Sequence, residues 1–159
     1  IVDDDAAFLR STLFMVEGLG FAAQRYALAE DFLAALPAPA PQGCCLLLDI
    51  RMPRISGLEL QRRLADLGRA FPIVFMTGHG DIDQAVQAMH AGAIDFLQKP
   101  FREQALLDAL NHAVGVGLAA QRQQVVAEPL IVDEAGHVQT GDAGLASALL
   151  ERLLRVLRR

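Results

Sequence analysis

The feature that most constrains the fold is a regular alternation of short apolar runs and helix-like segments, which occurs five times in 159 residues. The clearest run is Cys44–Asp49, which is almost wholly apolar and ends at a carboxylate. Such a run, bounded by turn residues, is typical of a strand buried on both faces of a parallel sheet. Strand–helix alternation predicts right-handed crossovers with helices on both faces. We therefore expect an α/β fold with a five-stranded, doubly wound parallel sheet and a short C-terminal appendage.

The other elements follow from the same periodicities. Four further strands are predicted at Ile1–Val2, Phe21–Tyr26, Pro72–Met76 and Ala93–Leu97. Helical spacing of apolar residues predicts helices at 6–18, 28–36, 58–67, 81–90 and 101–111. Asp5 precedes the first of these helices and Asp81 begins the fourth, and both are expected to cap them, because a carboxylate accepts hydrogen bonds from the first free amides.

Composition and charge exclude several classes of protein. Apolar residues make up 53% of the chain, enough for a core, and no apolar run approaches the ~20 residues that span a bilayer. Residues 1–112 carry fourteen acidic against nine basic residues, so this part has no electrostatic footprint for nucleic acid. Cys44 and Cys45 have neither disulfide nor metal-ligand spacing and are expected in the core. We expect a reducing, cytoplasmic setting and no secretory signal, with a few residues missing before Ile1.

Chemically useful side chains stand where the predicted strands end. Asp3 and Asp4 follow the first strand, Asp49 closes the third, and Thr77 and Lys99 follow the fourth and fifth. In a doubly wound sheet these ends converge on one edge. Carboxylates crowded there repel by about 4 kcal/mol per pair at ~4 Å and invite a hard divalent cation such as Mg²⁺. A hydroxyl and an ammonium beside them suit a bound phosphoryl group, which indicates phosphoryl transfer onto a carboxylate.

Four motifs, in order and at family spacing, resemble the receiver domain of two-component response regulators. They are IVDDD at 1–5, LLLDIRMP at 46–53, MTGHGD at 76–81 and QKPF at 98–101. The resemblance covers about residues 1–112, is strongest for the FixJ-like and DctD-like subgroups, and implies a flavodoxin-like receiver fold. In this interpretation Asp49 is a reactive group, whereas taken alone it could be a simple loop cap.

The resemblance implies that Asp49 is the phosphoacceptor and takes its phosphoryl group from the phosphohistidine of a sensor histidine kinase. Asp4 and Asp49, with Asp3 in support and the backbone carbonyl of Arg51 as a further ligand, are implied to hold Mg²⁺. The protein is then no enzyme in its own right, although it can lose its own phosphoryl group. His79 is expected to be a solvated loop residue rather than a catalytic base.

The resemblance also implies a switch. Thr77 would hydrogen-bond the phosphoryl group and Lys99 would pair with it. Phe96 would turn inward when Thr77 moves, although its position in a strand also fits ordinary burial. A cis peptide is implied before Pro100. The expected readout face is the fourth helix, fifth strand and fifth helix.

Three segments are predicted: a receiver domain at 1–112, a linker or extension of the fifth helix at 113–128, and an appendage at 129–159. The appendage is expected to hold a strand pair and an amphipathic helix, without a recognised output domain. Two functions stay open: a phosphorylation-controlled transcription regulator, and a stand-alone receiver acting through protein contacts without DNA. A phosphatase is a third, less favoured. Expected partners are the kinase and a second copy in a phosphorylation-dependent homodimer, with DNA only through an output domain and no membrane.

Overall fold

The computed structural model describes residues 1–36, 41–78, 81–127, 131–132 and 138–139. The chain divides into two compact units, Ile1–Gln121 and Arg122–Arg159. In the second unit, β4 (Ile131–Val132) pairs antiparallel with β5 (Val138–Gln139), in the region of the predicted strand pair. The amphipathic helix predicted near the C-terminus lies outside the described residues. Within the described part of the chain, no helix has the length and apolar character needed to cross a membrane.

The first unit is built on a parallel sheet with strand order β1-β2-β3. These strands are β1 (Leu46–Asp49), β2 (Ile73–Thr77) and β3 (Asp95–Gln98). Asp49 is the register partner of Met76, and Thr77 that of Gln98. Every residue of β1 and β2 is buried, as expected for strands covered on both faces. The predicted α/β class with a parallel sheet is confirmed.

The expectation of five strands is not confirmed for the described residues. The first two predicted strands appear only as parallel bridges from Val2 to Leu48 and to Tyr26. Val2 N–H donates to Leu47 O at 2.9 Å, so the segment does lie beside β1. Phe21 N–H instead donates to Val16 O at 3.2 Å. The start of the predicted second strand is therefore held by the end of the first helix, and Tyr26 alone reaches Val2.

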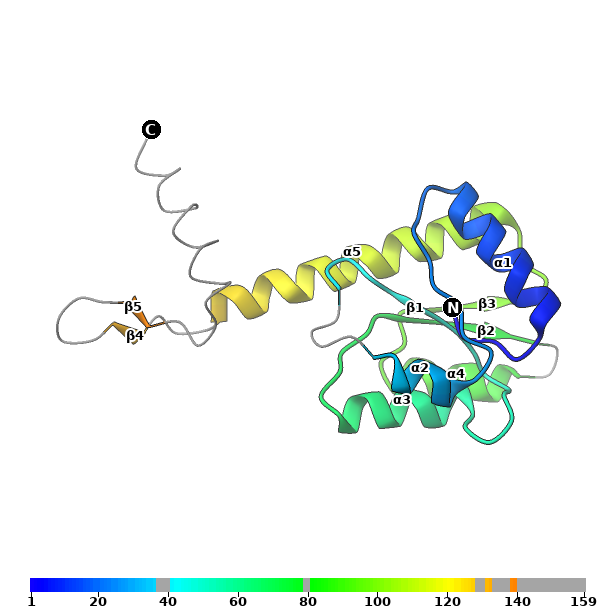
Figure 1. The fold of residues 1–159 in the computed structure, drawn as a ribbon, viewed down its shortest axis with the longest axis horizontal. Helices are drawn as coiled ribbons and strands as arrows, with labels where there is room; N and C mark the ends of the chain where they lie inside the picture. Colours follow the sequence, from blue (N-terminus) through cyan, green and yellow to red (C-terminus); the bar gives the residue numbers. More distant parts are fainter. Residues whose placement is uncertain (37–40, 79–80, 128–130, 133–137, 140–159) are drawn as a thin grey trace. The chain divides into compact units, whose positions relative to one another are not determined.

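Helices cover both faces of the sheet, with α1 and α5 on one side and α2, α3 and α4 on the other (Figure 1). Four of them lie within two residues of their predicted positions, whereas α5 continues well beyond its predicted end, through the two glycines of 113–128. Their bounds are α1 Ala6–Gly18, α2 Ala29–Ala34, α3 Gly57–Asp66, α4 Ile82–His90 and α5 Glu103–Ala127.

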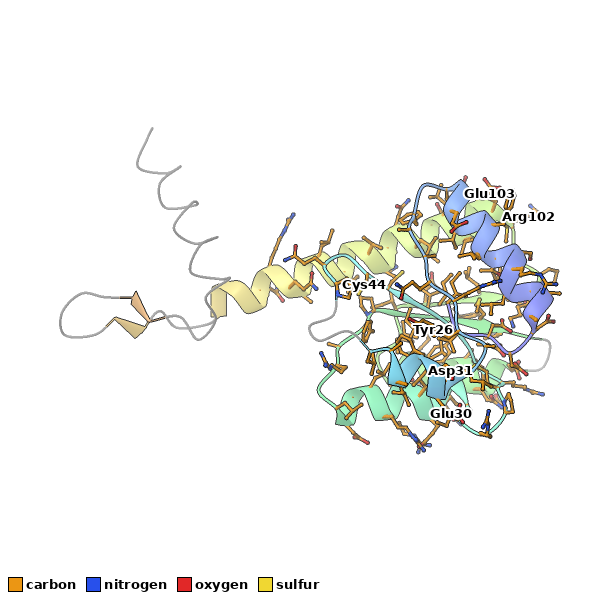
Figure 2. All side chains as sticks on the ribbon, in the orientation of Figure 1. Tyr26, Glu30, Asp31, Cys44, Arg102 and Glu103 are labelled. Carbon is orange, nitrogen blue, oxygen red and sulfur yellow. The ribbon has the colours of Figure 1, made fainter. Side chains whose placement is uncertain are left out.

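Alternate strand residues supply two apolar layers, one on each face of the sheet. Leu47, Val74 and Met76 pack in the layer that includes Leu106 and Leu110 of α5. The layer on the other face contains Leu48 and Phe75 with residues of α2, α3 and α4. Side chains fill both spaces in Figure 2. Because apolar side chains pack against both faces of the strands, the strand ends are fixed in place and can position polar side chains at this edge of the sheet.

Candidate functional site

Three carboxylates gather at the edge of the sheet where β1 ends. Ligand oxygens of Asp3, Asp4 and Asp49 all lie within 4.8 Å of one another. Asp49 is the last residue of β1, and the bridge from Val2 to Leu48 places Asp3 beside it. Asp3 and Asp49 are buried, whereas Asp4 is exposed. The predicted convergence of these carboxylates is therefore seen in the structure.

Lys99 reaches into this cluster from the segment after β3. Its Nζ lies 2.6 Å from Asp3 Oδ2 and 3.1 Å from Asp49 Oδ1. The ammonium also sits 4.4 Å from the centroid of the Phe8 ring, and Phe8 packs edge-on against Phe101. The Lys99–Pro100 peptide is cis, as the resemblance implied. In Figure 2, Arg102 and Glu103, which follow this segment, lie toward the opposite end of the sheet from Cys44.

Burial and charge set the ionisation of this pair. Loss of water contact raises the pKa of Asp49 from 3.8 to about 6, although the Lys99 ammonium opposes the rise. Burial alone would lower the pKa of Lys99, but the hydrogen bond and charge of Asp3, together with Asp49, outweigh it and raise that pKa. At neutral pH, Asp49 is therefore an ionised carboxylate held against a cation, which is the state that a nucleophilic oxygen requires.

The donor set fits a hard divalent cation. It offers carboxylate oxygens only, with a single lysine ammonium in direct contact to balance three negative charges. Such oxygen ligands suit Mg²⁺, and the exposed Asp4 leaves the group accessible from solvent. Asp3 Oδ1 accepts the Asp5 N–H at 2.9 Å and its Oδ2 contacts Lys99, so Asp3 is occupied by the protein. Asp4 and Asp49 are the better ligands, and a role for the Arg51 carbonyl stays a prediction.

Thr77 lies on the same edge as Asp49 but its hydroxyl is engaged elsewhere. Thr77 is buried and follows Met76, the register partner of Asp49. Its Oγ1 donates to Leu97 O at 3.4 Å, toward β3. The Thr77 carbonyl accepts the Lys99 N–H at 2.7 Å, which ties the two predicted phosphoryl-binding residues together.

The side chain of Phe96 is more exposed than its position in a strand suggested. Its position in a strand had suggested burial, yet its side chain is 47% exposed. Among the described strands β3 is at the edge of the sheet, and of its residues only Leu97 is buried. An edge strand is covered less completely than a central one, so its outward side chains remain in contact with solvent. The inward turn implied for Phe96 stays a prediction.

Asp5 and Asp81 each lie immediately before the helix that they were predicted to cap, but only the Asp5 side chain caps its helix. Asp5 accepts the amides of Ala7 and Phe8, as expected. Asp81 precedes α4 without a side-chain bond to it, and forms an ion pair with Arg51 while accepting the Gly78 N–H at 2.9 Å. Sequence reasoning missed this contact because nothing local distinguishes a capping aspartate from one that bridges two loops. His79 lies outside the described residues.

A parallel α/β sheet that brings three carboxylates and one lysine to its strand ends is typical of receiver domains. The model of the family described as "Response regulator receiver domain" matches residues 1–111 of the chain, close to the predicted boundary at 112. The chain belongs to this family.

Named relatives agree with the FixJ-like resemblance. The chain is 47% identical over 125 residues to the response regulator protein TmoT of Ectopseudomonas mendocina, covering 78% of this chain and 54% of TmoT. It is 40% identical over 139 residues to the transcriptional regulatory protein FixJ of Rhizobium meliloti (strain 1021), covering 87% and 63%. The crystal structure titled FixJ-N superposes with a TM-score of 0.67 at 42% identity, covering 72% of this chain and 90% of that one. The chain spans about half the length of the curated relatives TmoT and TodT.

Proposed function

We propose that Asp49 accepts a phosphoryl group from the phosphohistidine of a sensor histidine kinase. The observation that carries this proposal is the contact at 3.1 Å between Asp49 Oδ1 and the Lys99 ammonium at the end of a buried strand. Burial leaves Asp49 with a pKa of about 6, so its carboxylate is ionised at neutral pH and more basic than an exposed aspartate. Family membership supports the same role.

In the proposed transfer, a carboxylate oxygen of Asp49 attacks phosphorus while the bond from phosphorus to the imidazole nitrogen breaks. The imidazole leaves with the electron pair of that bond. Lys99 offsets the charge on the transferred group, and Asp3 holds the Lys99 ammonium in place through its 2.6 Å contact. Mg²⁺ bound by Asp4 and Asp49 would supply further charge neutralisation. Thr77 would exchange its bond to Leu97 O for one to a phosphoryl oxygen.

The proposed output is control of transcription through the face formed by α4, β3 and α5. Val86 and Met89 of α4 and Phe96 of β3 are large apolar side chains exposed on two of these elements. A surface of this kind suits a phosphorylation-dependent homodimer. The named FixJ relatives are transcriptional regulatory proteins, which favours this output over a stand-alone receiver. The kinase partner, Mg²⁺ and a cytoplasmic setting stay predictions.

Labelling with a radioactive phosphodonor tests the central step. The wild-type protein should be labelled in the presence of Mg²⁺, and Asp49→Asn should not be. Asp66→Asn is the matched control, because it changes the same charge at an exposed position in α3 and should be labelled normally. Undiminished labelling of Asp49→Asn would remove the assignment. DNA retention that falls steeply with salt would favour the transcriptional output, whereas phosphorylation-dependent dimerisation without DNA binding would favour the alternative.

A further inference from the structure

The buried carboxylate of Asp81 joins the loop after β1, which begins next to Asp49, to the loop after β2. Asp81 is 3% exposed, and its Oδ1 forms an ion pair with the guanidinium of Arg51. Its Oδ2 accepts the Gly78 N–H at 2.9 Å. Arg51 belongs to the loop after β1 and Gly78 to the loop after β2. We call this group the Arg51–Asp81–Gly78 bridge.

The bridge is formed in place of a local bond. An aspartate before a helix ordinarily accepts the amides of the first turn, as Asp5 does at 2.9 and 3.0 Å. Asp81 occupies the same position before α4 and makes no such bond with its side chain. A β-carbon added to Gly78 would lie 3.3 Å from Asp81 Oδ2, so the carboxylate is packed closely against this backbone. The carboxylate thus contacts Arg51 and the Gly78 N–H rather than the first amides of its own helix.

The bridge engages the Gly78 N–H, a hydrogen-bond donor that the proposed phosphorylation site would need. Arg51 is two residues after Asp49, and Gly78 is two residues after Met76, the register partner of Asp49. The Gly78 N–H points to Asp81, and the Thr77 hydroxyl points to Leu97 O. Neither donor is therefore free for an anion on Asp49 while these contacts persist. A phosphoryl group adds about two negative charges and three acceptor oxygens, which compete with Asp81 for the Gly78 N–H and with Leu97 O for the Thr77 hydroxyl.

We propose that the Arg51–Asp81–Gly78 bridge is a latch that holds the Gly78 N–H and the Arg51 side chain in their resting positions and opens when Asp49 is phosphorylated. The inference rests on the proposed phosphorylation of Asp49. In the open state the Gly78 N–H turns from the Asp81 carboxylate toward the phosphoryl group, and the exposed Arg51 side chain is released into solvent. Because the ligand must break the bridge, the bridge lowers the apparent affinity for it, and its removal shifts the population toward the open state. Asp81 is a positioning residue, since it acts through Gly78 and Arg51.

The test compares Asp81→Asn, Arg51→Gln and the double variant with wild-type protein. The first keeps the size of the side chain but removes the charge that binds Arg51. Affinity is measured by titration with beryllium fluoride, an analogue of the phosphoryl group, in the presence of Mg²⁺. Each single variant should bind about tenfold more tightly than wild type, and the double variant should gain no more than either single one. The Gly78 amide resonance of the unliganded variants should move toward its position in the liganded wild type.

Asp83→Asn is the matched control, because Asp83 is an exposed aspartate in the first turn of the same helix. It should bind like wild type. Equal affinity in wild type and Asp81→Asn, an additive double variant, or an unmoved Gly78 resonance would each overturn the latch. If thermal unfolding shows that Asp81→Asn is not folded, Arg51→Gln decides alone, since Arg51 is exposed and the change leaves Asp81 in place. Wild-type protein that takes no label on Asp49 would instead overturn the proposed function.

Discussion

Replacing Asp49 with asparagine is expected to stabilise the folded domain at neutral pH, although it removes the proposed phosphoacceptor. Burial raises the pKa of Asp49 from 3.8 to about 6, even with the Lys99 ammonium beside it. A raised pKa means that the fold favours the protonated carboxyl over the carboxylate. At pH 7.5 the folded protein must hold the carboxylate, and a neutral amide of similar size avoids this cost.

The magnitude follows from the shift. A change of about two pKa units corresponds to roughly 3 kcal/mol, and solvent screening of a partly hydrated site reduces this to about 1–2 kcal/mol. For a domain of this size, such a gain raises the melting temperature by several degrees. Urea unfolding at pH 7.5 measures the gain directly.

The pH dependence gives a sharper test. For wild-type protein, the favourable contribution of protonated Asp49 is fully present below pH 3.8 and is lost as pH rises through about 6. The advantage of Asp49→Asn should therefore be constant above about pH 7, shrink between pH 6 and 4, and vanish at lower pH. Asp66→Asn, at an exposed position, should show little change. An asparagine variant that gains nothing at pH 7.5, or whose advantage grows on acidification, would refute the burial argument.

Four further outcomes are expected. Lys99→Met should lower the free energy of unfolding by about 3 kcal/mol in urea at pH 7, because it leaves Asp3, which is fully buried, without its cation; an unchanged midpoint would contradict this. Gly57→Ala should destabilise strongly in thermal unfolding, because the new β-carbon would overlap the Asp49 carbonyl oxygen. Gly18→Ala, with nothing within 4 Å of its β-carbon, should be neutral or slightly stabilising. Mg²⁺ should raise the melting temperature of wild type more than that of Asp49→Asn, and equal shifts would place the metal elsewhere.

Several features of this protein could be predicted from the sequence because they depend on short-range order. Alternation of apolar runs with helical periodicity predicted the parallel sheet and, apart from the C-terminal end of α5, the helix positions within a few residues. The carboxyl ends of parallel strands lie at one edge of the sheet, so the presence of Asp49, Thr77 and Lys99 at the same edge followed from their places at the ends of three strands. The motifs predicted the family for the same reason, since they mark these strand ends.

Other features depended on which distant residues became neighbours. Lys99 contacts Asp3 across 96 positions of sequence, and Asp81 turns from its own helix to Arg51, a choice that no local pattern encodes. Phe21 is held by the end of α1, which reduced a predicted strand to one bridging residue. Phe96 is exposed because β3 lies at the sheet edge. Local periodicity determines which elements form, whereas the partners of their polar and edge residues are decided only when the layers pack together.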